Sequence, residues 1–298
     1  MLYLWCDARA ETPFAPGILM YQIESLNQRI KQEADMTSDN FKDIRIAFFD
    51  IDGTLIDIGR KQITTKTAEA LIRLKEKGVK ICLATGRPPS ILPRFPGIDF
   101  DANLTFNASY CYTDDEVIFR NPIPPADVQT VIRNAGKINR PVAVAGASRM
   151  GANGSDKDLE DYYAISGHDL VIADDFDELS REEIFQIMLG CREEEYPIIL
   201  EGVQGAKITA WWSRAADVIS ATGSKGFGIE KVLDYYCLTK EQAIAFGDGA
   251  NDIEMLKTVG TGVAMGNASD IVKSAADDVC GSAAEDGIYY YCKKHGLI

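Results

Sequence analysis

Only two histidines occur in this chain, and none of its cysteines are spaced as Cys-x-x-Cys. With so little histidine and no His-Glu-x-x-His motif, a zinc hydrolase or a Ser-His-Asp triad has little support. The seven cysteines are odd in number and sparse over 298 residues. A disulfide scaffold is therefore not expected, and we interpret the cysteines as reduced, mostly buried thiols.

The sequence also lacks an excess of basic residues and any long apolar run. Its 31 Lys and Arg against 45 Asp and Glu leave a formal net charge of −14. Binding to nucleic acid or to an anionic membrane needs a basic surface, and a membrane span needs roughly 18–20 apolar residues. Because 46% of the residues are hydrophobic, the chain has enough apolar side chains for a substantial core. We expect a cytoplasmic protein without nucleic-acid or membrane partners.

Residues 1–42 differ from the rest of the chain. They carry neither a basic segment nor a clean apolar segment of the kind found in signal peptides. We interpret them as an N-terminal extension, with the compact fold starting near Asp43. Met36 is a hypothetical natural start, which would make residues 1–35 dispensable.

From Ile44 onward the sequence alternates between strand and helix patterns. The apolar run 44–50 predicts a buried strand. Thr64 or Thr65 can cap a helix that ends at Gly78, and 79–86 predicts the next strand. The same alternation returns after residue 216. It is typical of a Rossmann-like parallel sheet, so the fold class is α/β. We assign 43–88 and 216–298 to this core, and 89–215 to an inserted α+β cap.

Four polar motifs follow predicted strands or precede a predicted helix of the core. Ligands of open α/β sheets bind beyond the carboxyl ends of the strands, so we expect these motifs to meet. Each motif alone is readily explained as a turn, a helix cap or a solvated charge, but the four in this order favour a functional site. The motifs are Asp50-Ile51-Asp52-Gly53-Thr54-Leu55, Thr85-Gly86-Arg87, Gly223-Ser224-Lys225-Gly226 and Gly247-Asp248-Gly249-Ala250-Asn251-Asp252.

The residue types in these motifs suit a metal ion and a phosphate group. Asp50 and Asp248 offer the hard oxygen ligands that Mg²⁺ prefers. The hydroxyl of Thr85 and the ammonium of Lys225 can hold phosphoryl oxygens. The lysine and the metal would also reduce repulsion between a phosphate dianion and the carboxylates.

The four motifs together resemble the haloacid dehalogenase (HAD) superfamily. The insertion of roughly 130 residues between the second and third motifs resembles the large cap of the Cof-type branch. The resemblance covers about 44–298, and it implies a Mg²⁺-dependent phosphatase. It is not specific for a substrate.

The resemblance implies a catalytic role for two acids. Asp50 would be the nucleophile that forms an aspartyl-phosphate. Asp52 would be the general acid for the leaving alcohol and then the general base for water. The pump ATPases of the superfamily carry Thr at the place of Asp52 and keep a longer-lived phosphoenzyme, so an acid there implies release of phosphate.

The resemblance also implies binding roles. Phosphate-binding residues would be Thr85, Gly86, Lys225 and Asn251. The Mg²⁺ ligands would be Asp50, the backbone carbonyl of Asp52, and Asp248, with Asp252 supporting the metal site or pairing with Lys225.

One segment departs from the family pattern. The family often shows Asn-Gly-Ala after the third strand, whereas this chain has Asn107-Ala108-Ser109. Asn107 remains a tentative substrate contact, because its turn lacks the usual glycine.

Three functions stay open at this point. The first is a phosphatase of small phosphorylated metabolites, such as sugar phosphates, and the second is a phosphotransferase or phosphomutase on the same scaffold. The third is a non-enzymatic, Mg²⁺-binding phospho-acceptor module like a signalling receiver. The chain length and the acid at Asp52 argue against the third.

Overall fold

The computed structural model describes residues 41, 43–59, 62–165 and 167–298. The expected extension 1–42, apart from Phe41, and the hypothetical start at Met36 lie outside these residues. Residues 44–298 form one unit by their mutual contacts. None of the helices in the described ranges combines the length and the apolar character that crossing a membrane requires.

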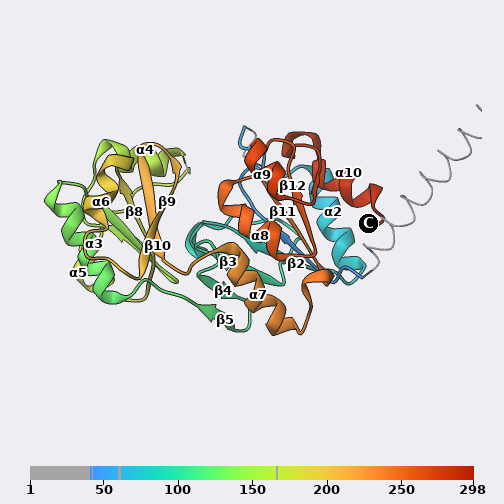
Figure 1. Cartoon of the computed structure of the whole chain (residues 1–298), viewed down its shortest axis with the longest axis horizontal. Helices are drawn as coiled ribbons and strands as arrows, with labels where there is room; N and C mark the ends of the chain where they lie inside the picture. The colour runs from blue at the N-terminus through green and yellow to red at the C-terminus, as the bar shows by residue number, and fades with distance from the viewer. Residues whose placement is uncertain (1–40, 42, 60–61, 166) are drawn as a thin grey trace, which may run out of the picture. The chain divides into compact units, whose positions relative to one another are not determined.

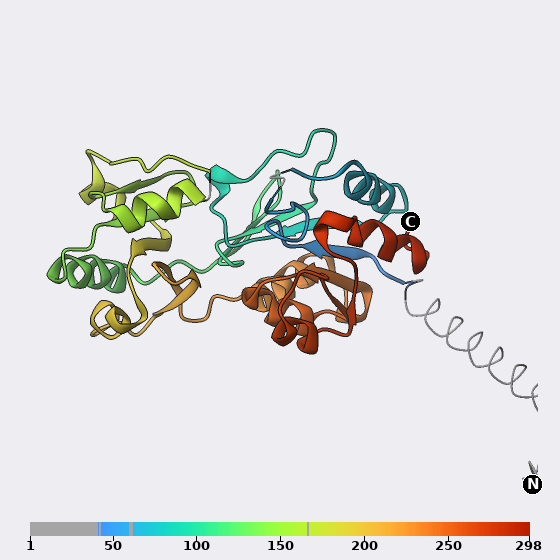
Figure 2. The same cartoon turned by 90° about the horizontal axis from the view of Figure 1, so that it is seen from above.

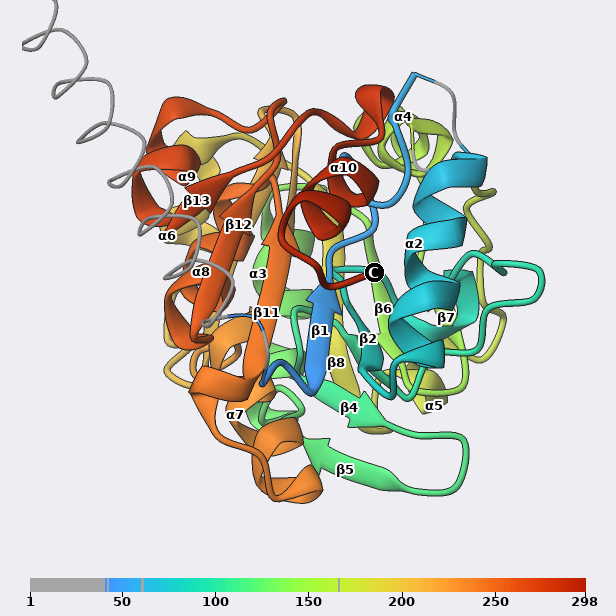
Figure 3. The ribbon, with the colours of Figure 1, turned by 90° about the vertical axis from the view of Figure 1, so that its right-hand side faces the viewer.

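An eight-stranded sheet forms the core, in the order β13-β12-β11-β1-β2-β3-β4-β5 (Figure 1). The pairings from β13 through β3 are parallel, and those that join β3, β4 and β5 are antiparallel. Figure 3 shows β12, β11, β1 and β2 side by side. This parallel sheet confirms the predicted α/β class. Its strands are β1 (Ile46–Phe49), β2 (Lys80–Ala84), β3 (Ala102–Thr105), β4 (Tyr110–Tyr112), β5 (Val117–Arg120), β11 (Ala243–Gly247), β12 (Thr261–Ala264) and β13 (Asp278–Val279).

Helices cover both faces of the parallel strands, which explains why β1 is an uninterrupted apolar run. On one face, Ile46 and Phe48 pack with apolar side chains of α7, α8 and α9. On the other, Phe49 stacks on Phe246, whose ring meets Tyr291 of α10 edge-on. Figure 2 shows α2 and α10 on one side of the sheet and α7 to α9 on the other. These helices are α2 (Thr65–Glu76), α7 (Lys225–Tyr236), α8 (Ile253–Thr258), α9 (Asp270–Ala275) and α10 (Gly287–Lys294).

The inserted domain is built on a five-stranded antiparallel sheet in the order β7-β6-β8-β10-β9. One face packs against α3, α5 and α6, and the other against α4. Antiparallel strands with helices on their faces match the α+β insertion that the sequence predicts. The strands are β6 (Val142–Gly146), β7 (Met150–Ala152), β8 (Ile184–Gly190), β9 (Ala206–Trp212) and β10 (Ala215–Ser220), and the helices are α3 (Pro125–Lys137), α4 (Lys157–Ile165), α5 (Phe176–Leu179) and α6 (Tyr196–Ile199).

The sheet pairing shifts the limits expected for the inserted domain, 89–215. Strands β3, β4 and β5 extend the core sheet, since β3 pairs in parallel with β2. At the other end, β10 continues the inserted sheet to Ser220. The strands β3, β4 and β5 lie between Ala102 and Arg120. Local sequence does not show which sheet edge accepts them, because that depends on backbone hydrogen bonds to a strand distant in sequence.

A buried carboxyl group lies inside the inserted domain. Asp217 of β10 is 5% exposed and accepts a 2.8 Å hydrogen bond from the hydroxyl of Tyr162. Burial raises the pKa of Asp217 to about 6, although hydrogen bonds from Gln186 and Tyr162 oppose the rise. The neutral form of Asp217 is therefore favoured in the folded state, and its ionisation costs stability.

We predict that Asp217→Asn stabilises the protein above pH 6 and has little effect near pH 4. The raised pKa contributes stability that is complete below the ordinary pKa near 4 and is lost as the pH rises through 6. The difference between the ordinary pKa and the pKa in the folded state corresponds to about 3 kcal/mol. Urea unfolding followed by circular dichroism from pH 4 to pH 8 measures this. The control is Asp174→Asn at an exposed aspartate, which should change stability by less than about 0.5 kcal/mol. A stability difference for Asp217→Asn that stays constant with pH would contradict the account.

Candidate active site

The polar motifs meet at one edge of the core sheet. Asp50 directly follows β1, Thr85 follows β2, and Asp248 follows β11. β1 lies between β2 and β11, and all three run parallel. Their carboxyl ends therefore share one edge, where the backbone N–H of Asp50 donates to the carbonyl of Phe246 at 3.0 Å. This is the edge where open α/β sheets bind ligands.

A buried lysine binds two of the acids. The ammonium of Lys225 is 0% exposed and lies 2.6 Å from Oδ1 of Asp50 and 2.6 Å from Oδ1 of Asp252. Lys225 is the first residue of α7, whose N-cap is the side chain of Ser224. Gly226 allows α7 to pack closely, because a Cβ there would lie 2.9 Å from the carbonyl oxygen of Glu254. Local helix capping and a close helix contact thus hold the lysine against the carboxylates.

Three carboxylates come close enough to share a cation. Asp50, Asp248 and Asp252 each offer an oxygen within 4.8 Å of the others. Asp252 uses both of its oxygens within the protein, since Oδ1 binds Lys225 and Oδ2 accepts from the backbone N–H groups of Asp248 and Gly249. Asp50 and Asp248 are therefore the better candidates for metal ligands, and Asp252 supports them.

The chemistry of this cluster fits a divalent ion. Three carboxylates face the single ammonium of Lys225, which leaves an excess of two negative charges. The ligand atoms are all hard oxygens, as Mg²⁺ prefers. The turn at Gly53 leaves no room for a side chain, because a Cβ there would lie 2.2 Å from Oδ2 of Asp248 and φ is +89°. Glycine thus allows the loop after β1 to approach Asp248.

The pKa values of the cluster reflect the burial of its groups and the charges of their neighbours. Burial raises the pKa of Asp50, the Lys225 ammonium lowers it, and Asp252 and Asp248 raise it further. Burial also raises the pKa of Asp248 to about 6, against a hydrogen bond from Thr54. For Lys225, burial lowers the pKa, but the attraction of Asp252 and Asp50 outweighs it and the pKa rises. Lys225 is held charged, and a further cation would stabilise the carboxylates.

The predicted phosphate-binding residues lie at the same edge. The side-chain amide of Asn251 donates to Oδ1 of Asn107 at 2.9 Å, and the backbone N–H of Asn107 donates to the carbonyl of Thr85 at 2.9 Å. A Cβ on Gly86 would lie 3.4 Å from the amide nitrogen of Asn107. The structure therefore brings Asn107 next to Thr85, Gly86 and Asn251, although Ala108 occupies the position where the family often has glycine.

The side chain of Asp52 is exposed to solvent, whereas that of Asp50 is buried. The Asp52 side chain is 49% exposed, and both of its oxygens accept hydrogen bonds from Arg87, at 2.7 and 2.8 Å. Arg87 stands in the second motif, Thr85-Gly86-Arg87, where the sequence alone gives it no role. His168 of the inserted domain also interacts electrostatically with this pair. Burial lowers the pKa of His168, Arg87 lowers it further, and Asp52 opposes the change.

Two further residues of the site were not predicted. Thr54 donates to Oδ1 of Asp248 at 2.9 Å, and Asn267 donates to Oδ2 at 3.0 Å and to the carbonyl of Gly53 at 2.9 Å. Thr54 belongs to the first motif, so its place in the sequence could have indicated a role in the site. Asn267 begins an Asn-Ala-Ser triplet, which reads only as a glycosylation sequence, so nothing in the chain pointed to this contact.

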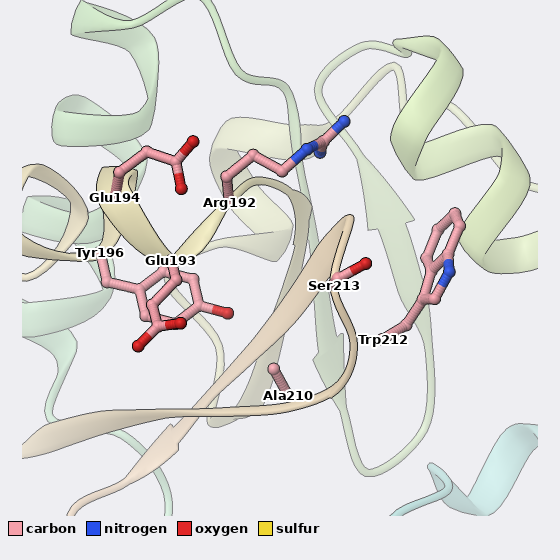
Figure 4. A pocket seen from close by; sticks show the side chains of 7 residues that line it. All are labelled: Arg192, Glu193, Glu194, Tyr196, Ala210, Trp212 and Ser213. Atoms are coloured by element: carbon pink, nitrogen blue, oxygen red, sulfur yellow. The ribbon is translucent and has the colours of Figure 1, made fainter.

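A cavity of about 540 Å³ lies elsewhere, in the inserted domain (Figure 4). Its single guanidinium belongs to Arg192, which is already bound to Oδ2 of Asp158 at 2.8 Å and to the carbonyl of Arg214. No predicted site residue lines it, so it does not alter the location of the candidate site. The lining residues are Arg192, Glu193, Glu194, Tyr196, Ala210, Trp212 and Ser213.

The chain matches the haloacid dehalogenase-like hydrolases over residues 47–292. It belongs to this family. It is 32% identical over 261 residues to the "Putative phosphatase YkrA" of Bacillus subtilis, covering 86% of this chain and 99% of the relative. It is 27% identical over 260 residues to the 5-amino-6-(5-phospho-D-ribitylamino)uracil phosphatase YitU of the same organism, covering 83% and 95%. These matches confirm the family that the four motifs indicated.

A solved structure supports the same assignment. The fold superposes on a sugar phosphatase of HAD subclass IIB with a TM-score of 0.78 and 32% identity, covering 85% of this chain and 100% of the other. The expected enzyme class, a phosphatase of this family, is thereby confirmed.

We predict that Lys225→Met lowers the free energy of unfolding of the metal-free protein at pH 7 by about 3–5 kcal/mol, because it leaves two buried carboxylates without their cation. The deficit should shrink as the pH falls, since protonation removes the unpaired charge. Chemical denaturation at several pH values measures both. Lys240→Met is the matched control. Its ammonium lies 3.0 Å from Glu230 on the surface, and it should cost less than about 1 kcal/mol. Equal losses in the two variants would contradict the importance of the buried lysine.

Proposed function

We propose that the protein is a Mg²⁺-dependent phosphatase that hydrolyses small phosphorylated metabolites, such as sugar phosphates, through an aspartyl-phosphate at Asp50. The observation that carries this proposal is the buried contact of Asp50 with Lys225 beside Asp248, at the strand ends of a haloacid dehalogenase-like fold. The names of the relatives support the substrate class. One acts on a phosphorylated ribitylaminouracil and another on sugar phosphates.

The reaction proceeds in two successive displacements at phosphorus. First, a carboxylate oxygen of Asp50 attacks phosphorus, the bond from phosphorus to the ester oxygen breaks, and Asp52 gives its proton to that oxygen. Then Asp52 takes a proton from water, whose oxygen attacks phosphorus and displaces Asp50. Ester and water become alcohol and inorganic phosphate, and Asp50 is regenerated.

The protein's own groups hold the phosphoryl oxygens during both steps. Lys225 supplies a fixed positive charge, and Thr85, Gly86 and Asn251 supply hydrogen-bond donors at the same edge. These donors are held in place by the fold before the substrate binds, so little reorganisation is needed when charge moves in the transition state.

Asp50, the backbone carbonyl of Asp52, and Asp248 would hold the Mg²⁺ ion. When bound, the ion neutralises phosphoryl charge and reduces the repulsion between the phosphate and the carboxylates. Asp252 keeps Asp248 in place by accepting a hydrogen bond from the backbone N–H of Asp248. The hydroxyl of Thr54 orients the carboxylate of Asp248 further by donating a hydrogen bond to it.

We further propose that the protein acts in the cytoplasm on a soluble metabolite. Its net charge of −14 opposes binding to nucleic acid or to an anionic membrane surface. The substrate itself is therefore the expected partner.

A panel of phosphate monoesters in the presence of Mg²⁺ tests the activity. We expect inorganic phosphate to be released, and Asp50→Asn to abolish release because an amide is not a nucleophile for this step. The surface control Asp114→Asn should keep the wild-type rate. Full turnover by Asp50→Asn would disprove the assigned nucleophile. Transfer to an acceptor without release of phosphate would instead identify a phosphotransferase or mutase.

Binding of the metal can be tested without activity. We expect millimolar Mg²⁺ to raise the melting temperature of the wild type by several degrees, because a ligand that binds only the folded state stabilises it. Asp248→Asn should lose most of this shift, whereas the exposed control Asp270→Asn should retain it. An unchanged shift in Asp248→Asn would exclude Asp248 as a ligand.

A further inference from the structure

The contact between Arg87 and Asp52 joins the loops that follow β1 and β2. Nη2 and Nε of Arg87 donate separately to Oδ1 and Oδ2 of Asp52, at 2.7 and 2.8 Å. Such a two-point pair fixes the plane of a carboxylate as well as its position. A single hydrogen bond or a distant charge would leave that plane free to rotate.

Arg87 is itself held firmly. Its Nη1 donates to the carbonyl of Ile91 at 3.3 Å, its backbone N–H donates to Oγ1 of Thr85 at 3.2 Å, and its backbone carbonyl accepts from Phe106 at 3.2 Å. The side chain of Arg87 is 22% exposed, against 49% for Asp52. The arginine is thus the anchored partner and the aspartate the exposed one.

A general acid must present its proton to one particular oxygen. Positioning of reacting groups accounts for a large part of enzymatic rate enhancement, and a displacement of about 1 Å can cost about 100-fold. Because the side chain of Asp52 is 49% exposed, packing restrains its rotamer less than it restrains a buried side chain. Among the described residues, Arg87 donates hydrogen bonds to both carboxylate oxygens of Asp52.

We propose that Arg87 is a positioning residue that holds the carboxyl group of Asp52 toward the ester oxygen in the first step and toward water in the second. The inference rests on the proposed function, in which Asp52 is the acid and base. Arg87 acts through Asp52 and exchanges no proton itself. One of the two hydrogen bonds from Arg87 is released while Asp52 transfers its proton, and the other keeps the carboxyl group oriented.

This role has a kinetic signature that a purely structural role lacks. An alkyl phosphate needs its leaving oxygen protonated, whereas p-nitrophenyl phosphate has a stable leaving anion and hardly does. The value of kcat/KM reports the steps up to phosphoenzyme formation, so it isolates the acid. We expect Arg87→Ala to lower kcat/KM for an alkyl phosphate by about 10-fold or more, which is part of the roughly 100- to 10,000-fold that general acid catalysis contributes. The loss for p-nitrophenyl phosphate should stay below about 3-fold.

The arginine side chain, rather than the fold, is what these variants alter. Arg87→Ala keeps the backbone contacts to Thr85 and Phe106, and its folding is checked by the melting temperature. Arg87→Lys, which retains the charge but not the two-point geometry, should fall between Arg87→Ala and the wild type. Arg149→Ala is the matched control, because Arg149 contacts the carboxylates of Glu182 and Asp175 on the inserted domain. It should leave both esters unaffected.

A double-mutant cycle tests whether Arg87 acts through Asp52. Asp52→Asn should reproduce the selective loss with the alkyl phosphate. In that background, adding Arg87→Ala should change the ratio of the two kcat/KM values by less than about 2-fold. A further 10-fold change would show that Arg87 acts on the substrate directly, and would overturn the proposal.

Two other outcomes are separable. If Arg87→Ala lowers kcat/KM equally for both esters while Asp52→Asn is selective, the proposed function stands and the positioning role of Arg87 is wrong. If Asp52→Asn shows no dependence on the leaving group, the acid role of Asp52 is wrong, and the inference about Arg87 falls with it.

Discussion

The site depends on one buried ammonium. Lys225 lies without solvent exposure between Asp50 and Asp252, which stand 175 and 27 positions away in the chain. Removing such charges from water costs several kcal/mol per ion, and the cost is offset only when the geometry is good and the remaining lone pairs are satisfied. Asp252 meets this condition because it also accepts hydrogen bonds from two backbone N–H groups. These contacts fix the position of the carboxylate of Asp50, the nucleophile in the proposed reaction.

The negative charge that Lys225 leaves uncompensated determines which ligands suit the site. Lys225 compensates only part of the charge of three carboxylates, so the edge of the sheet is suited to a divalent cation followed by a phosphate dianion. The close approach that concentrates this charge requires small residues. Gly53 allows one loop to reach Asp248, and Gly226 lets α7 deliver Lys225. Stability and catalysis therefore make opposing demands on the same few side chains.

Asn107 illustrates how packing overrides local preference. Phe106, Asn107 and Ala108 all have positive φ, at 52°, 53° and 64°, a conformation that glycine adopts most readily. The sequence gives Asn107 only as a tentative substrate contact, because its turn lacks the usual glycine. The turn nevertheless forms, since Phe106 stacks on Phe185 and the methyl of Ala108 occupies the space beside Gly228. Burial of Phe106 and Ala108 contributes to holding a backbone that is intrinsically unfavourable.

Features that depend on a local pattern could be predicted from the amino-acid sequence alone. The apolar run of 44–50, a helix cap at Thr64 or Thr65 and the return of alternation after residue 216 were enough for the α/β class. The order of the four motifs was enough for the family. These succeed because periodicity and turn chemistry act over a few residues. Three features could be seen only in the folded chain: β3, β4 and β5 extend the core sheet, Arg87 holds Asp52, and Asn267 contacts Asp248. Each of these is a contact between segments distant in the chain, set by the direction of a side chain or by the pairing of an edge strand, and neither is encoded in local sequence.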